Sequence, residues 1–167
     1  SGGRHRSRTG AQRAGRAGAR SRRIGLQAVD DRVHRGRDRW ILRQGTAAVR
    51  LGDHPAAIEA YEQGIDAAES SGDEERLARL LRQLGASELQ VGASADALAH
   101  YQRALAIHRT RSEVMPSAIA LVGVGNACAQ LGNKAEARTA FDEAAALRES
   151  LGDDKGTAAI RKASESL

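Results

Sequence analysis

Residues 81–104 read LRQLGASELQVGASADALAHYQRA, and related stretches lie 40 residues before and 40 residues after them. The earlier copy, residues 41–64, reads ILRQGTAAVRLGDHPAAIEAYEQG, and the later copy, residues 121–144, reads LVGVGNACAQLGNKAEARTAFDEA. The three copies align without a gap. Self-similarity at a fixed period of roughly 20–50 residues predicts a repeat architecture, in which each unit buries its apolar face against its neighbours.

The positions that agree between the copies are those on which helix packing depends. Two glycine positions, one alanine position and one aromatic position recur in all three copies: Gly45, Gly85 and Gly125; Gly52, Gly92 and Gly132; Ala57, Ala97 and Ala137; Tyr61, Tyr101 and Phe141. An alanine and an aromatic residue four positions apart lie on the same face of a helix. Three of the four aromatic residues in the chain occupy this one position, which predicts that these rings are buried between units.

Each unit is predicted to be a pair of helices joined by a turn. Leu77, Leu80, Leu81 and Leu84 have the i, i+3/4, i+7 spacing of a buried helical stripe. This pattern predicts first helices at about 34–51, 74–91 and 114–131, each ending at a glycine suited to a left-handed conformation. Three residues are predicted to cap the second helices, with Glu136 as a capping-box partner of the third: Asp53, Ser94 and Asn133.

The pattern resembles the tetratricopeptide repeat over residues 40–156. The resemblance rests on Leu84-Gly85, Gly92, Ala97, Tyr101 and Ala104 and on their counterparts in the other copies. The common form of this repeat has a period of about 34 residues. The 40-residue form here resembles the arrays of bacterial signalling ATPases and transcription regulators, and those of cell-polarity adaptors. The resemblance implies an all-α, right-handed superhelical solenoid that docks or senses other proteins and is not an enzyme.

We expect two regions in the chain. Residues 1–33 form a basic arm or linker, partly disordered, and residues 34–167 form the array, with repeats at about 34–73, 74–113 and 114–153. A fourth unit would need a glycine at position 165, where Glu165 stands. Residues 155–167 are therefore predicted to be a capping helix, with Ile160, Ala163 and Leu167 on its inner side, because stacked arrays need a polar outer face at their ends.

By the resemblance, the first helices line a concave groove. Projected onto this sequence, the groove holds a mixture of apolar, basic and amide side chains with few acids: Arg39, Leu42, Thr46, Val49, Arg50, Arg79, Arg82, Ala86, Leu89, Gln90, Ile119, Val122, Asn126, Ala129 and Gln130. Arginine offers paired donors to a carboxylate, so this composition favours a peptide or protein partner with an acidic group. The alternative is that these arginines are ordinary solvated residues of a helix face.

Positive charge is concentrated at the N-terminus. Residues 1–39 hold 12 Arg and three acids, a net charge of +9, whereas residues 40–167 have a net charge of −4. Electrostatic contact of this arm with nucleic-acid phosphates is one interpretation, and it makes a nucleic-acid-associated regulator the alternative function. A solvated linker is the other interpretation, favoured because the arginine-rich stretch contains no aromatic residue on which a base could stack.

The remaining candidates for chemistry favour structural roles. The single cysteine, Cys128, excludes an internal disulfide, and we expect it to be a small core residue. The five histidines lack the spacing of metal ligands, and no phosphate-binding loop, nucleophile elbow or cofactor motif is present. No apolar run reaches the ~18 residues of a membrane span. The sequence therefore predicts a cytoplasmic binding module without catalytic residues, cofactor or metal, and leaves open whether it self-associates.

Overall fold

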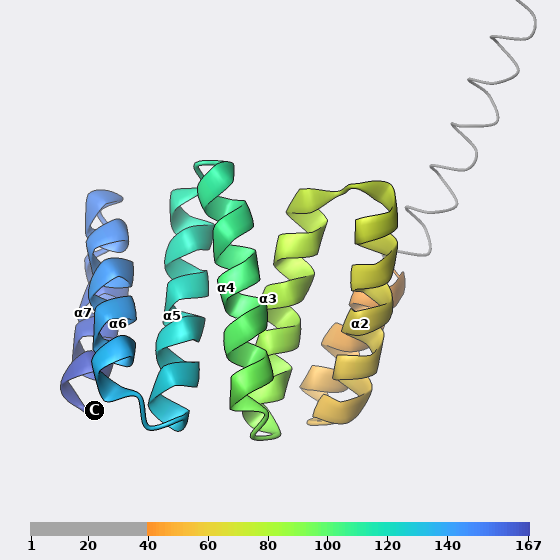
Figure 1. The fold of residues 1–167 in the computed structure, drawn as a ribbon, viewed down its shortest axis with the longest axis horizontal. Helices are drawn as coiled ribbons and strands as arrows, with labels where there is room; N and C mark the ends of the chain where they lie inside the picture. The colour runs from red at the N-terminus through yellow and green to blue at the C-terminus, as the bar shows by residue number, and fades with distance from the viewer. Residues whose placement is uncertain (1–39) are drawn as a thin grey trace, which may run out of the picture. The chain divides into compact units, whose positions relative to one another are not determined.

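The computed structural model describes residues 40–167, and every regular element in that range is an α-helix (Figure 1). The helices follow one another through short turns: helical residues 40–50, then α2 (His54–Ser71), α3 (Glu74–Gln90), α4 (Ser94–Thr110), α5 (Val114–Gln130), α6 (Lys134–Ser150) and α7 (Asp154–Glu165). Each helix from α2 to α7 packs mainly against the helices before and after it. The predicted all-α solenoid of helix pairs is confirmed for these residues.

Aspartates and glycines set the helix boundaries. Asp53, Asp73 and Asp153 stand at the N-caps of α2, α3 and α7, where each side chain accepts a hydrogen bond from the backbone N–H three residues further on. These bonds satisfy N–H groups that have no partner within the helix. Gly72 ends α2 with φ of 68°, a left-handed conformation in which its N–H reaches the last carbonyls of the helix.

Of the three predicted caps, Ser94 is wrong in position, whereas Asp53 and Asn133 stand at the N-caps where they were predicted. Ser94 is the first residue of α4, because Ala93 occupies the cap position, and the Ser94 hydroxyl donates instead to Gln130 Oε1 at 2.6 Å. Asn133 stands at the N-cap of α6 but makes no capping bond. Its Nδ2 donates to Glu136 Oε2 at 3.4 Å, so the two side chains pair with each other rather than with the backbone.

The repeated aromatic residues fill slots that the repeated glycines leave open. Tyr61, Tyr101 and Phe141 are 1%, 6% and 2% exposed. The Tyr101 ring lies between Gly85 of α3 and Gly123 of α5. A Cβ atom would come within 2.9 Å of this ring at Gly85 and within 2.2 Å at Gly123. The predicted burial of these rings between helices is confirmed, because only glycine leaves room for them.

The core runs along the array as a series of contacts between neighbours. Leu77, Leu80, Leu81 and Leu84 of the predicted stripe are all buried in α3. At the C-terminal end, Ile160 of α7 is buried against the cluster that contains Phe141, and Ala163 and Leu167 pack partly against the same cluster. The helix α7 thus covers the apolar face that α5 and α6 would otherwise expose.

Neighbouring units of the array meet at two equivalent places. We call the contact of α2, α3 and α4 the first junction and the contact of α4, α5 and α6 the second junction. Equivalent positions in the two junctions differ by 40 in residue number.

None of the helices described is long and apolar enough to cross a membrane. The predicted basic arm and Arg39 lie outside the residues that the structure describes.

Candidate functional site

The first-helix face is the surface formed by helical residues 40–50, α3 and α5. The backbones of α3 and α5 come close to each other, so these first helices of neighbouring units are adjacent. All of the predicted groove residues within the described range lie on these helices and are at least partly exposed, except the buried Leu89: Leu42, Thr46, Val49, Arg50, Arg79, Arg82, Ala86, Gln90, Ile119, Val122, Asn126, Ala129 and Gln130.

Arg82 has a buried polar atom without a hydrogen-bond partner on this face. It is half-buried on α3, and its Nε atom is buried without a hydrogen-bond partner. Burial lowers the pKa of the Arg82 guanidinium; Tyr101 and Glu113 oppose this effect, whereas the positive charge of Arg79 adds to it. Arg79 lies three residues earlier and is exposed. The face therefore has two neighbouring cations and no carboxylate in hydrogen-bond contact with Arg82.

Amide and hydroxyl groups of the face are partly occupied by the protein itself. Gln130 accepts the hydrogen bond from Ser94, which ties the end of α5 to the start of α4. The Thr46 hydroxyl donates to the Leu42 carbonyl at 2.8 Å within its own helix. Asn126 is exposed and lies on α5 one turn after Val122. Of the predicted polar contacts, Asn126 therefore keeps its amide available, whereas Gln130 has a structural partner.

The face changes character along the array. Its α3 portion is basic, because Arg79 and Arg82 are there, and its α5 portion is apolar. Ile119 is 39% exposed and Val122 is half-buried beside it in the helix. Large aliphatic side chains with this exposure are a feature of binding surfaces when they adjoin one another. The α3 portion could thus bind a carboxylate, while the α5 portion could cover an apolar side chain.

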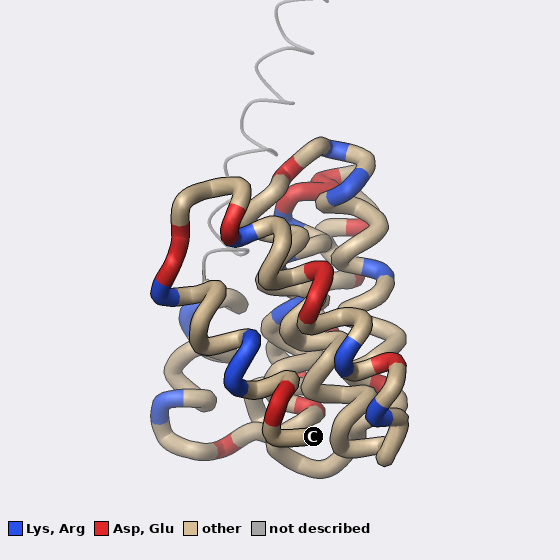
Figure 2. The backbone as a smooth tube through the Cα atoms, turned by 90° about the vertical axis from the view of Figure 1, so that its left-hand side faces the viewer, with Lys and Arg blue, Asp and Glu red and all other residues tan. Residues whose placement is uncertain are grey.

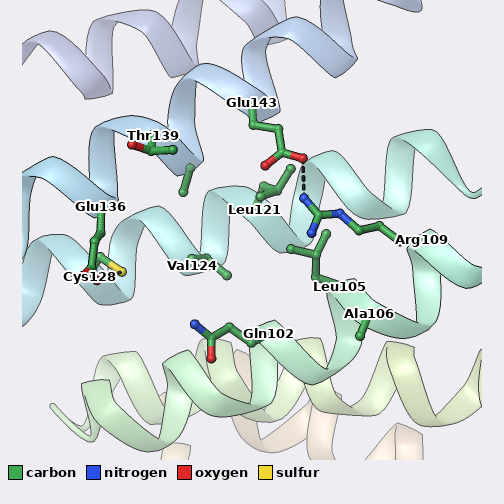
Figure 3. Close-up of a pocket in the computed structure, with 11 residues that line it drawn as sticks. Gln102, Leu105, Ala106, Arg109, Leu121, Val124, Cys128, Glu136, Thr139 and Glu143 are labelled. Carbon is green, nitrogen blue, oxygen red and sulfur yellow. Dashed lines mark hydrogen bonds and ion pairs between the residues drawn. The ribbon is translucent and has the colours of Figure 1, made fainter.

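A hollow of about 440 Å³ lies at the second junction, on the side away from the first-helix face. Its walls are α4 and α6 and its floor is α5, with Leu105, Leu121 and Val124 among the apolar residues that line it (Figure 3). This hollow was not predicted from the sequence. The repeat pattern consists of positions at which the three copies agree, whereas the hollow depends on residues in which they differ.

Polar groups stand at the two ends of the hollow. Arg109 and Glu143 form an ion pair across it from α4 to α6 (Figure 3). At the other end, Glu136 accepts hydrogen bonds from Asn133 Nδ2 and, at 3.8 Å, from the Cys128 thiol. Burial raises the pKa of Cys128, and the Glu136 carboxylate raises it further, so the thiol form is favoured. Cys128 is 2% exposed, which confirms its predicted place in the core.

Charged residues elsewhere on the array alternate in sign. Figure 2 shows basic and acidic positions interspersed along the helices rather than gathered in one large field. Within residues 40–167, no group of three or more His, Cys, Asp or Glu side chains is placed to hold a metal ion.

Comparison with known proteins identifies the repeat. Models of the tetratricopeptide repeat match residues 38–110 and residues 82–151. No curated protein matches the chain. Among solved structures, the TPR domain of Arabidopsis FLU superimposes with a TM-score of 0.67 at 22% identity, over 70% of this chain and 98% of that one.

Two further structures share the fold at lower identity. The first TPR domain of human RPAP3 gives a TM-score of 0.60 at 20% identity, over 77% of this chain and 90% of that one. The N-terminal domain of the C. elegans stress-induced protein STI-1 gives 0.62 at 17% identity, over 77% and 95%. Together with the in-register copies, the helix pairs and the ring-in-glycine packing, these matches show that the chain belongs to the tetratricopeptide repeat family.

Proposed function

We propose that this chain is a scaffold module that binds a protein segment carrying an acidic residue on its first-helix face, without catalysing a reaction. Tetratricopeptide repeat domains generally mediate protein–protein interaction. The finer statement, that the partner is acidic and occupies the groove predicted from the sequence, rests on one observation: the half-buried Arg82, whose Nε atom has no hydrogen-bond partner.

A carboxylate beside the exposed part of the Arg82 guanidinium would compensate for the partial burial of this charge. The Nε atom itself is closed to solvent, so a partner would bond to the outer nitrogens of the guanidinium. Arg79 on the same face adds a second cation, and a carboxylate accepts paired hydrogen bonds from a guanidinium. Ile119 and Val122 on the adjacent first helix would contact an apolar side chain of the same segment. We therefore infer a partner with an acidic residue followed or preceded by an apolar one.

The proposal is tested with synthetic peptides that pair an aliphatic residue with either Asp or Asn. The acidic peptides should bind more tightly, and the Arg79→Glu/Arg82→Glu double variant should lose that preference. The loss should be steepest at low salt, where charge attraction is least screened. Arg103→Glu/Arg138→Glu is the matched control, since it makes the same change in net charge on the second helices. A groove variant that binds as well as wild type, while the control fails, would show that the site is elsewhere.

The alternative function, contact with DNA or RNA through residues 1–33, falls outside the described residues and stays a prediction. Deletion of residues 1–39 separates the two functions. Removal of the arm should abolish a salt-dependent shift with nucleic acid if the arm makes that contact, and should leave peptide binding by the array unchanged.

A further inference from the structure

The hollow of the second junction exists because three side chains are smaller there than in the first junction. In the first junction the equivalent positions hold Leu84, Glu88 and His100, and the His100 Nδ1 and Glu88 Oε2 atoms are 2.8 Å apart. In the second junction the same positions hold a smaller residue each: Val124, Cys128 and Ala140. Removing this bulk without closing the helices together leaves the space between α4 and α6.

The dimensions of the hollow suit a side chain or a small group rather than water alone. Its volume of about 440 Å³ lies within the range of roughly 300–1,000 Å³ that is common for ligand sites. The floor is apolar, since Leu121 and Val124 of α5 line it, and Leu105 adds apolar surface from the α4 wall. An open groove with an apolar floor between two helices has the form that receives the apolar face of a further helix.

Two carboxylates at the rim of the hollow, Glu136 and Glu143, determine which charge a binding partner should carry there. Glu136 is exposed and accepts hydrogen bonds from Asn133 and Cys128, and no basic side chain among the described residues forms an ion pair with it. Glu143, seven residues later on α6, is already paired with Arg109. A cation at the Glu136 end therefore meets an unpaired carboxylate, whereas an anion there would meet only a like charge.

We propose that this hollow docks an amphipathic helix of a partner protein, which inserts a Leu-, Ile- or Phe-type side chain over the α5 floor and presents a Lys or Arg to Glu136. One helical turn spans about 5.4 Å, so an apolar residue and a cation four positions apart lie on one face of the docked helix. This site is separate from the first-helix face. The chain could hold an acidic segment on one side and a basic, apolar helix on the other.

The experiment uses the whole 167-residue chain and three synthetic alanine-rich helical peptides. The first carries Leu and Lys four positions apart, the second replaces Lys by Glu, and the third replaces Leu by Ala. Fluorescence anisotropy should show the Leu/Lys peptide binding at least about tenfold more tightly than either relative, because a like charge at the interface and the loss of the apolar anchor each weaken binding. Equal binding of all three, or binding of none, would overturn the proposal.

The place of binding is read from Cys128, which is the single cysteine of the chain and lines the hollow. The Leu/Lys peptide should slow the reaction of this thiol with a maleimide reagent several-fold. A Val124→Leu/Ala140→Leu variant, which fills the hollow, should lose the binding at least about tenfold. Glu136→Gln, a change at an exposed position, should weaken it several-fold, and it decides the question if the filled variant does not fold.

Asp142→Asn on α6 is the matched control, since this exposed acid does not line the hollow. It should leave the affinity unchanged. Arg79→Glu/Arg82→Glu should also leave it unchanged, which distinguishes this proposal from the one made for the first-helix face. Unaltered binding in both the filled variant and Glu136→Gln would show that the peptide binds somewhere else.

Discussion

Neighbouring units of the array share their inner packing, whereas the two junctions between them differ in their outer surface. In each of the first two units, a tyrosine of the second helix enters a slot beside a glycine of its own first helix: Tyr61 beside Gly45, and Tyr101 beside Gly85. Outside this layer, the first junction is filled by the Glu88–His100 pair, whereas the second is hollow. The charges that bridge the second helices are also exchanged, with Glu69–Arg103 in the first junction and Arg109–Glu143 in the second.

This difference separates the residues that make the fold from those that make the surface. The glycine, alanine and aromatic positions recur because each unit must accept the next at close range. The positions one layer further out touch only solvent or a neighbouring side chain, so they can change size and sign from unit to unit. The recognition properties of such an array are therefore found where the repeats disagree.

The largest expected loss of stability tests the packing of tyrosine rings beside glycines that the units share. Tyr61→Ala and Tyr101→Ala should each lower the free energy of unfolding by about 3–5 kcal/mol, the usual cost of emptying an aromatic site in a core. Urea denaturation followed by circular dichroism measures both. Leu51→Ala is the control, because this side chain is 85% exposed and should change stability by less than about 0.5 kcal/mol. A loss under about 1 kcal/mol for either tyrosine would contradict the shared packing.

The next largest effect tests the Glu88–His100 pair, which the first junction has and the second lacks. His100→Ala leaves the Glu88 carboxylate, 6% exposed, without its partner, and should cost about 1–3 kcal/mol at neutral pH. Burial raises the pKa of Glu88 from its ordinary value of 4.5, and the His100 hydrogen bond partly offsets this. Because a protonated carboxyl does not need the pair, the cost should shrink below pH 4.5 and grow as pH rises through the raised folded pKa.

Gln102→Ala on the same helix is the control for His100→Ala, since this exposed residue should change stability by less than about 0.5 kcal/mol at either pH. Thermal denaturation at neutral and acidic pH measures the difference. A destabilisation that does not depend on pH would show that His100 acts through packing alone.

The smallest effect tests the exchanged ion pairs. Arg103→Glu places two acids together between α2 and α4 and should cost about 0.2–1 kcal/mol, the usual size for exposed pairs. The double variant Glu69→Arg/Arg103→Glu copies the arrangement of the second junction and should recover most of the loss. A double-mutant cycle at low and high salt measures the coupling, which should weaken as salt rises. No recovery in the double variant would show that the two pairs are not interchangeable.

Much of the fold could be predicted because it depends on positions visible in the sequence. The 40-residue period, the buried leucines of α3 and the shared aromatic position all correspond to contacts in the structure. The helix N-caps were harder to predict from the sequence. Ser94 has the chemistry of an N-cap, but α4 begins at Ser94 itself and its hydroxyl bonds to Gln130, 36 residues away. Local propensity gave no sign of that distant partner.

The sequence by itself determined the helices, their pairing and the identity of the repeat, because each of these follows from spacing along the chain. Only the tertiary structure decided which surfaces remain open. The charges that act on Arg82 come from Arg79 of α3, Tyr101 of α4 and Glu113 of the α4–α5 turn. The hollow at Val124, Cys128 and Ala140 depends on the distance between α4 and α6, which leaves space that these small side chains do not fill. Both features arise from distances between helices, which no single stretch of sequence encodes.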